Sequence, residues 1–250
     1  MKATKRSKTE SEHCEDEQKI MKPVVSRFFV DRLNDDFFAN VSCVNLAKKI
    51  LGKLLCRRLE SSGEVLKGIV VESESYLGAE DVASHSYKGK ITARNEPMFM
   101  KAGTAYVYFT YGMYHCFNIS SEGEGSAVLI RALQPIQGLQ TMESLRKRFS
   151  KKANGKPIKA THLCNGPAKL CIAFDICKQT INKQDVTCSD LIWFENGFDV
   201  SECDIVAAPR IGISADEEWK LKPLRFYIKN NEYVSVRNKK EKIETNVNLS

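Results

Sequence analysis

The chain has 250 residues, of which 42% are hydrophobic and 28% charged, as in an ordinary globular protein. This composition excludes a collagen, a coiled coil and a wholly disordered chain, and the length allows one large domain or two small ones. No apolar run approaches the ~20 residues of a membrane span, and no signal-peptide core follows Met1. We therefore expect an intracellular protein with no membrane partner.

The nine cysteines are odd in number and include no Cys-x-x-Cys pair, which argues against a disulfide framework. We expect reduced and mostly buried thiols. Because the four histidines have no paired cysteines to join them, we expect no metal site, and we expect no other cofactor.

Polar, charged segments without apolar periodicity stand at both ends of the chain. Residues 1–24 are expected to form a disordered leader and residues 238–250 a loose tail, which leaves one folded domain over 25–237. The leader carries a short basic run of the kind found in nuclear import signals, so the predicted compartment is the nucleus. This run consists of Lys2, Lys5, Arg6 and Lys8.

The first predicted helix covers residues 43–51, where Ser42 suits the N-cap and Gly52 the left-handed C-cap position. Two strands follow, over 53–59 and 65–76, and a Ser-Ser-Gly turn joins them. The chain therefore passes from a helix directly into strands.

The rest of the domain mixes strands and helices without a βαβ rhythm. Two further strands meet near residues 111–113, another covers 127–132, and a helix over 139–148 comes next. The last predicted elements are a helix from Pro167 to about Phe174 and strands over 224–229 and 233–236. This order favours a single-domain α+β fold with a curved, mostly antiparallel sheet, flanking helices and a protruding hairpin.

The strand at 65–76 carries two carboxylates and a phenol on one face, because alternate residues of a strand point the same way. Glu72, Glu74 and Tyr76 share this face, in a strand that is otherwise rich in valine. One interpretation is a solvent-facing edge. The other is a cleft that needs a carboxylate base beside an aromatic wall.

Aromatic side chains are concentrated over residues 103–119. Tyr106 and Tyr108 share one face of a strand, whereas Tyr111 and Met113 lie at a tight turn. Exposed aromatic residues at a hairpin tip usually meet a partner. In a basic protein that partner can be a nucleic acid, with one ring entering the duplex and another stacking on an extruded base. The alternative is a tyrosine-rich sheet face packed beneath a loop.

A basic block over residues 145–160 contains seven Lys and Arg and no acidic residue. The seven positive charges of this block equal the formal net charge of the chain, +7, so the positive and negative charges of the remaining residues balance. A local basic patch on a balanced chain favours a polyanionic partner, with nucleic acid first, and a solvated loop is the alternative. The residues predicted to contact a DNA backbone are Arg146, Lys147, Lys151 and Lys152.

Several long segments, in the same order, resemble the alkyladenine (3-methyladenine) DNA glycosylases of the mammalian type. The resemblance runs from about Phe28 to Val236. It is carried by VESESYLGAEDVASHS (71–86), TARNEPMFMKAGTAYVYFTYGMYHCFNIS (92–120), VLIRAL (128–133), CNGPAKLC (164–171), RIGI (210–213) and KPLRFY (222–227). Long motifs in a fixed order are a specific signal, so residues 25–237 are expected to be a glycosylase domain.

The resemblance implies a monofunctional enzyme that flips a damaged purine out of double-stranded DNA and hydrolyses its N-glycosidic bond. The implied substrates are alkylated or deaminated purines, namely 3-methyladenine, 7-methylguanine, ethenoadenine and hypoxanthine. The resemblance places the general base on Glu74 and leaves Glu72 structural or exposed. Arg131 would help to hold the attacking water and the adjacent nucleotide. A carboxylate suits this chemistry because the sugar becomes cationic in the transition state. An ion pair with a sheet carboxylate is the other role open to Arg131.

The resemblance also implies a base pocket and an intercalating residue. The pocket residues are Tyr76, His85, Tyr108, Asn118 and Cys116. Aromatic faces attract a cationic alkylated base, and Asn118 would exclude the exocyclic amine of guanine. Tyr111 would enter the duplex, with Met113 supporting the bend.

Two other functions stay open. A non-catalytic nucleic-acid-binding module could share this fold, but such a module has no need of a carboxylate such as Glu74 facing a polyanion. The protein could also bind lesions without turnover, which a single-turnover assay distinguishes. We expect a monomeric enzyme of base excision repair whose partner is double-stranded DNA containing damaged purines.

Overall fold

The computed structural model describes residues 32–149 and 156–238 of the chain. The predicted leader and nearly all of the predicted tail lie outside these ranges, as do Lys151 and Lys152 of the basic block. No helix within the two ranges is long and apolar enough to cross a membrane.

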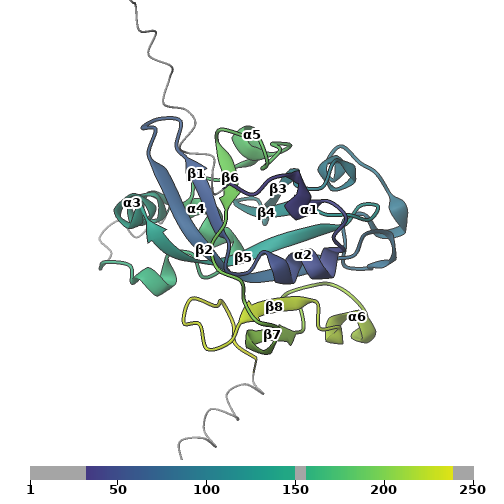
Figure 1. The fold of residues 1–250 in the computed structure, drawn as a ribbon. Coiled ribbons are helices and arrows are strands. Elements are labelled where there is room, and N and C mark those ends of the chain that lie inside the picture. Colours follow the sequence, from purple (N-terminus) through teal and green to yellow (C-terminus); the bar gives the residue numbers. More distant parts are fainter. Residues whose placement is uncertain (1–31, 150–155, 239–250) are drawn as a thin grey trace, which may run out of the picture. The chain divides into compact units, whose positions relative to one another are not determined.

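The fold is built on one antiparallel sheet (Figure 1). Its strands are β1 (Leu54–Arg58), β2 (Val65–Tyr76), β3 (Ala105–Thr110), β4 (Tyr114–Ser120), β5 (Ala127–Gln137), β6 (Ile192–Glu195), β7 (Ile205–Ala208) and β8 (Arg225–Ile228). They follow the order β3-β4-β5-β2-β1-β6, while β8 pairs with β2, and β7 pairs with β8. The predicted α+β class with an antiparallel sheet and a hairpin, formed by β3 and β4, is confirmed.

Strand β2 is central to the sheet. Strand β5 pairs along one edge of β2, whereas the other edge is shared by β1 at residues 65–69 and β8 at residues 72–74. The register between β2 and β5 shifts at three places between residues 67 and 73. Such bulges bend a strand and increase its twist, which accounts for the curvature of the sheet.

Short helices flank the sheet (Figure 1). They are α1 (Asp35–Phe38), α2 (Cys43–Lys49), α3 (Leu139–Phe149), α4 (Pro167–Ala173), α5 (Lys178–Ile181) and α6 (Glu217–Leu221). The 3₁₀ turns are η1 (Gly78–Glu80), η2 (Tyr87–Gly89), η3 (Glu96–Phe99), η4 (Ala160–His162) and η5 (Glu202–Asp204).

Hydrogen bonds to helix α2 determine which face of β2 is turned toward this helix. The hydroxyl of Ser73 donates to the carbonyl of Ala47 across 2.6 Å, and that of Ser75 donates to the carbonyl of Cys43 across 3.3 Å. Because side chains alternate along a strand, the carboxylates at 72 and 74 point away from α2. One continuous hydrophobic cluster packs α2, the sheet and α4 together, with Leu46, Phe117 and Leu170 fully buried.

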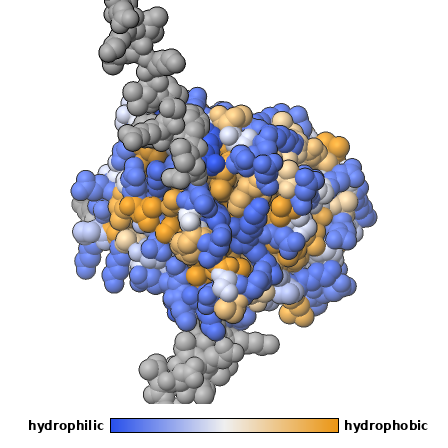
Figure 2. Space-filling model, viewed as in Figure 1, coloured by the Kyte–Doolittle hydropathy of each residue, from blue (hydrophilic) through white to orange (hydrophobic). Residues whose placement is uncertain are grey.

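The surface and the thiols agree with the composition. On the face seen in Figure 2, hydrophilic residues alternate with small apolar areas, as is usual for a protein surface. The cysteines of the described ranges form no disulfide with one another, and the expectation of reduced thiols stays a prediction. The buried ones are Cys43, Cys56, Cys116, Cys164 and Cys171.

Most predicted elements are confirmed, including the strand at 65–76, and the strand predicted at 127–132 continues to Gln137. The strand predicted at 233–236 is wrong, because that segment forms turns. Its backbone donors bond to side chains instead of a neighbouring strand. The N–H of Tyr233 donates to Asn231 Oδ1 across 2.9 Å, and the N–H of Ser235 donates to Glu72 Oε2 across 2.8 Å.

Candidate active site

Glu74 lies near the end of β2 and has no exposed surface. Its Oε1 accepts a hydrogen bond from the backbone N–H of Ile211 at 2.8 Å and lies 3.2 Å from Arg131 Nη1. Its Oε2 accepts a hydrogen bond from the Tyr76 hydroxyl at 3.1 Å. Three donors from different parts of the chain therefore fix the orientation of this carboxylate.

Glu72 is equally buried but belongs to a structural ion-pair network. Its Oε1 is 2.7 Å from Arg225 Nη1 and 3.4 Å from Arg131 Nε, and its Oε2 accepts from the N–H of Ser235. Arg131 thus joins the two carboxylates, so the ion pair with a sheet carboxylate is present, and the role of Arg131 beside the attacking water stays a prediction. The interpretation of this strand face as a solvent-facing edge is wrong.

The charges of this cluster act on one another strongly. Burial opposes the charged form of Arg131, but the carboxylates of Glu74 and Glu72 outweigh it and raise the pKa of the guanidinium. Burial, and then the charge of Glu74, raise the pKa of Tyr76 well above its ordinary value. The Tyr76 hydroxyl therefore keeps its proton and stays a hydrogen-bond donor to Glu74.

A cavity of about 380 Å³ opens beside this cluster. It is lined by five of the predicted site residues, Tyr76, His85, Tyr108, Tyr111 and Asn118. Further lining residues that the sequence does not single out include Ser84, Arg94, Met98 and the segment 212–214. Tyr76 lines the cavity and also bonds Glu74, so it connects the cavity with the carboxylate.

Three aromatic side chains pack together in one wall of the cavity. The His85 ring lies 4.6 Å from that of Tyr108, and His85 Nδ1 is 2.8 Å from the Tyr106 hydroxyl. Burial, helped by the charge of Arg94, lowers the pKa of His85 to about 4. The imidazole is therefore neutral at physiological pH and adds no charge to the wall. The guanidinium of Arg94 in turn lies 5.1 Å from the centre of the Tyr108 ring.

Asn118 and Cys116 extend from β4, the strand that pairs with the one carrying these tyrosines. Asn118 is buried, and its Nδ2 donates to the carbonyl of Tyr106 across 3.0 Å. Cys116 pairs with Tyr108 across the hairpin and its thiol lies beside the Tyr108 hydroxyl, but it is not among the residues that line the cavity. Its place is therefore next to the wall and not on its surface.

The β3–β4 hairpin reverses direction over residues 111–113 and carries Tyr111 at its tip. Both Tyr111 (φ 51°) and Gly112 (φ 64°) are left-handed, and the N–H of Met113 donates to the carbonyl of Thr110 across 3.2 Å. Such turns favour asparagine and glycine, so a tyrosine here is strained. Tyr111 is 86% exposed and Met113 51%. A bulky residue held in a costly conformation and in water is typical of a functional position.

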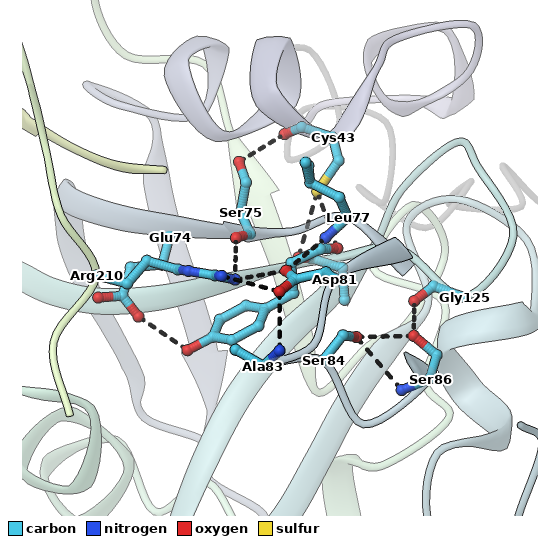
Figure 3. A network of polar contacts seen from close by, with 12 residues as sticks. Cys43, Glu74, Ser75, Leu77, Asp81, Ala83, Ser84, Ser86, Gly125 and Arg210 are labelled. Atoms are coloured by element: carbon cyan, nitrogen blue, oxygen red, sulfur yellow. Dashed lines mark hydrogen bonds and ion pairs between the residues drawn. The ribbon is translucent and has the colours of Figure 1, made fainter. Parts of the chain in front are cut away.

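A second buried ion pair lies directly beside the site, although the sequence does not indicate that its two residues pair. Arg210 Nη1 and Nη2 bond the two oxygens of Asp81 at 2.5 and 2.9 Å, and Nη1 also donates to the carbonyl of Ser75 at 3.0 Å (Figure 3). Asp81 also accepts from the backbone N–H groups of Leu77 and Ala83 (Figure 3). The pair anchors the segment whose next residue, at 211, donates to Glu74.

The basic block is described in part. Arg146 is half-buried and its Nη1 donates to the carbonyls of His162 and Leu163, while Lys147 pairs with Glu143 at 2.7 Å. Arg146 therefore joins α3 to the segment that follows the block.

Known proteins resemble this chain over most of its length. The sequence profile of the methylpurine-DNA glycosylase family matches residues 36–232. A probable DNA-3-methyladenine glycosylase of Encephalitozoon cuniculi is 48% identical over 80% of this chain and 92% of its own length. The DNA-3-methyladenine glycosylase of Mus musculus is 48% identical over 82% of this chain and 61% of its own length, and that of Homo sapiens is 47% identical over 82% and 68%.

A buried carboxylate beside an aromatic cavity, together with these matches, defines a hydrolase of N-glycosidic bonds. The chain belongs to the methylpurine-DNA glycosylase family. The predicted family resemblance is confirmed.

Proposed function

We propose that the protein excises alkylated and deaminated purines from double-stranded DNA in base excision repair. Its substrates would be 3-methyladenine, 7-methylguanine, ethenoadenine and hypoxanthine. The observation that carries the proposal is the fully buried carboxylate of Glu74, bonded to Tyr76 at the edge of the aromatic cavity. A non-catalytic binding module would gain nothing from such a charge beside a polyanion.

In the proposed reaction, a water molecule attacks C1′ of the flipped nucleotide. Glu74 accepts a proton of the water, the water oxygen bonds to C1′, and the bond from C1′ to the purine nitrogen breaks with its electron pair leaving on the purine. The negative charge of Glu74 also stabilises the cationic sugar of the transition state. Arg131 and the N–H of Ile211 hold the carboxylate in one orientation. The product is an abasic site in an intact strand.

The cavity would hold the flipped base between aromatic walls. Tyr76, His85 and Tyr108 offer ring faces and edges, and faces of this kind attract a cationic alkylated purine. Asn118, held by its bond to Tyr106, would exclude the exocyclic amine of guanine. Cys116 would support the wall through Tyr108.

Tyr111 would fill the space that the flipped nucleotide leaves in the duplex, with Met113 beside it. This role explains why a tyrosine occupies a left-handed turn position in water. The basic block, including Lys151 and Lys152, would bind phosphates. The enzyme would act as a monomer in the nucleus, without metal or cofactor.

A single-turnover assay on a duplex with one 1,N6-ethenoadenine tests the proposal. We expect release of the free base and an abasic site that breaks only after alkali treatment. The same duplex with adenine is the control and should stay intact. Tight binding of the lesion without base release would instead make this a lesion-binding protein.

A further inference from the structure

The cavity wall formed by Tyr76 has a buried charge pair behind it. The guanidinium of Arg210 lies 4.7 Å from the centre of the Tyr76 ring. Tyr76 lines the cavity, whereas neither Arg210 nor Asp81 does, so the pair covers a part of the ring that the cavity does not reach. Both side chains of the pair are fully buried. Water therefore screens their charges little.

We propose that the Arg210–Asp81 pair determines, through the Tyr76 ring, how the site discriminates between cationic and neutral flipped bases. The inference rests on the proposed function, because it concerns the base that the cavity receives. Arg210 is in this sense a specificity-determining residue that never touches the substrate.

The electrostatics of an aromatic ring give the pair this influence. A ring face attracts a cation because the face is the negative part of the quadrupole. A base stacked on Tyr76 at about 3.5–4 Å would lie roughly 8 Å from the guanidinium, with only the ring between them. A lone positive charge at Arg210 would oppose binding of a cationic purine and leave a neutral purine almost unaffected.

Asp81 compensates that charge through two parallel hydrogen bonds (Figure 3). Its oxygens also accept hydrogen bonds from the backbone N–H groups of Leu77 and Ala83, which hold the carboxylate in place. The Nη1 of Arg210 that bonds Asp81 also donates to the carbonyl of Ser75, the residue next to Glu74 on β2. The balance of one positive and one negative charge behind the ring is thus built into the fold.

The test compares two lesions in otherwise identical duplexes, 7-methylguanine as the cationic base and hypoxanthine as the neutral one. Single-turnover excision rates are measured for both with the same protein preparation, so that any misfolded fraction cancels in their ratio. Arg210→Gln leaves Asp81 uncompensated but retains donors for it, and should raise the 7-methylguanine to hypoxanthine ratio. Asp81→Asn leaves Arg210 uncompensated and should lower that ratio. We expect a change on the order of fivefold in each direction.

Two control variants separate charge from structure. Arg210→Lys keeps the charge and should leave the ratio within about twofold of wild type, whatever it does to both rates. The double variant Asp81→Asn with Arg210→Gln removes both charges and should return the ratio toward the wild-type value. Equal losses for both lesions in every variant would show that the pair only supports the fold, and would overturn the inference while the proposed function stands. A wild-type protein that releases neither base would overturn both.

Discussion

The Tyr76 hydroxyl donates to the Glu74 carboxylate across 3.1 Å, from the next position on the same face of β2. A wall of the base cavity and the proposed general base are therefore joined by one hydrogen bond. The raised pKa of Tyr76 keeps this bond in place through the physiological pH range. In the proposed reaction, positioning of the flipped base and activation of the water thus depend on the same strand segment.

Glu74→Gln should retain lesion binding and lose nearly all excision, because an amide keeps the shape but accepts no proton. Single-turnover rates and equilibrium binding to the same duplex measure the two effects separately. Turnover of the variant at the wild-type rate would exclude Glu74 as the general base. Glu72→Gln is the matched control, since Glu72 is equally buried. It should weaken a buried ion pair and lower stability by about 3 kcal/mol, while the folded protein retains most of its activity.

Tyr111→Asn should reduce excision most where the lesion is in a stable base pair. Asparagine suits the left-handed turn, so this variant should fold at least as stably as wild type, with a gain of about 0.5–1 kcal/mol. Flipping costs a few kcal/mol in a stable pair and little in a bulge, so the loss should nearly vanish for bulged lesions. Excision rates in paired and bulged duplexes, and the fluorescence of ethenoadenine, measure this dependence. Equal losses in both contexts would assign Tyr111 to the pocket or the core.

His85 should make the protein less stable in acid. The unfolded chain takes up this proton near pH 6.5 and the folded protein only near pH 4, so the unfolded state binds more protons between these values. The stability from neutral His85 is complete above pH 6.5 and is lost as the pH falls toward 4, by at most about 2 kcal/mol after screening. Unfolding free energies of wild type and His85→Gln across this window measure the difference. Parallel curves would mean that the imidazole titrates normally.

The basic block should divide into a structural and a DNA-binding part. Arg146→Gln should lower stability by about 1–2 kcal/mol, because its Nη1 bonds two backbone carbonyls. Replacing Lys151 and Lys152 by glutamine should weaken binding to any duplex. The slope of log affinity against log salt should become shallower by about 0.9 for each phosphate that the variant no longer neutralises. An unchanged slope would indicate that the two lysines are a solvated surface.

Alternation along one strand is enough to predict that Glu72, Glu74 and Tyr76 share a face, and a tight turn is enough to predict an exposed tip at Tyr111. Alternation does not predict, however, that Glu72 and Glu74 are buried. The face of β2 that carries the carboxylates is contacted by the N–H groups of Ile211 and Ser235, more than 130 residues further along the chain. Local patterns contain no information on such contacts.

The same limit explains the elements and residues that sequence patterns do not indicate. Strands β6 and β7 have four residues each, too few to show a period, and they are defined by their pairing with β1 and β8. Arg210 and Asp81 both lie in segments that carry the family resemblance, but they are 129 residues apart, so no local pattern indicates that they pair. The predicted strand at 233–236 fails for the converse reason, since a suitable local pattern meets no partner strand.

Both edges of β2 are hydrogen-bonded, and this has a consequence for the dynamics of the site. The amides of a strand paired on both sides exchange with solvent only when the whole sheet opens. Glu74 is carried by that strand, whereas Tyr111 lies in the turn between β3 and β4, outside the strand pairing. Hydrogen exchange of the backbone amides should therefore be slower around Glu74 than around Tyr111. On heating, excision of a bulged lesion should disappear together with the global fold and not before it.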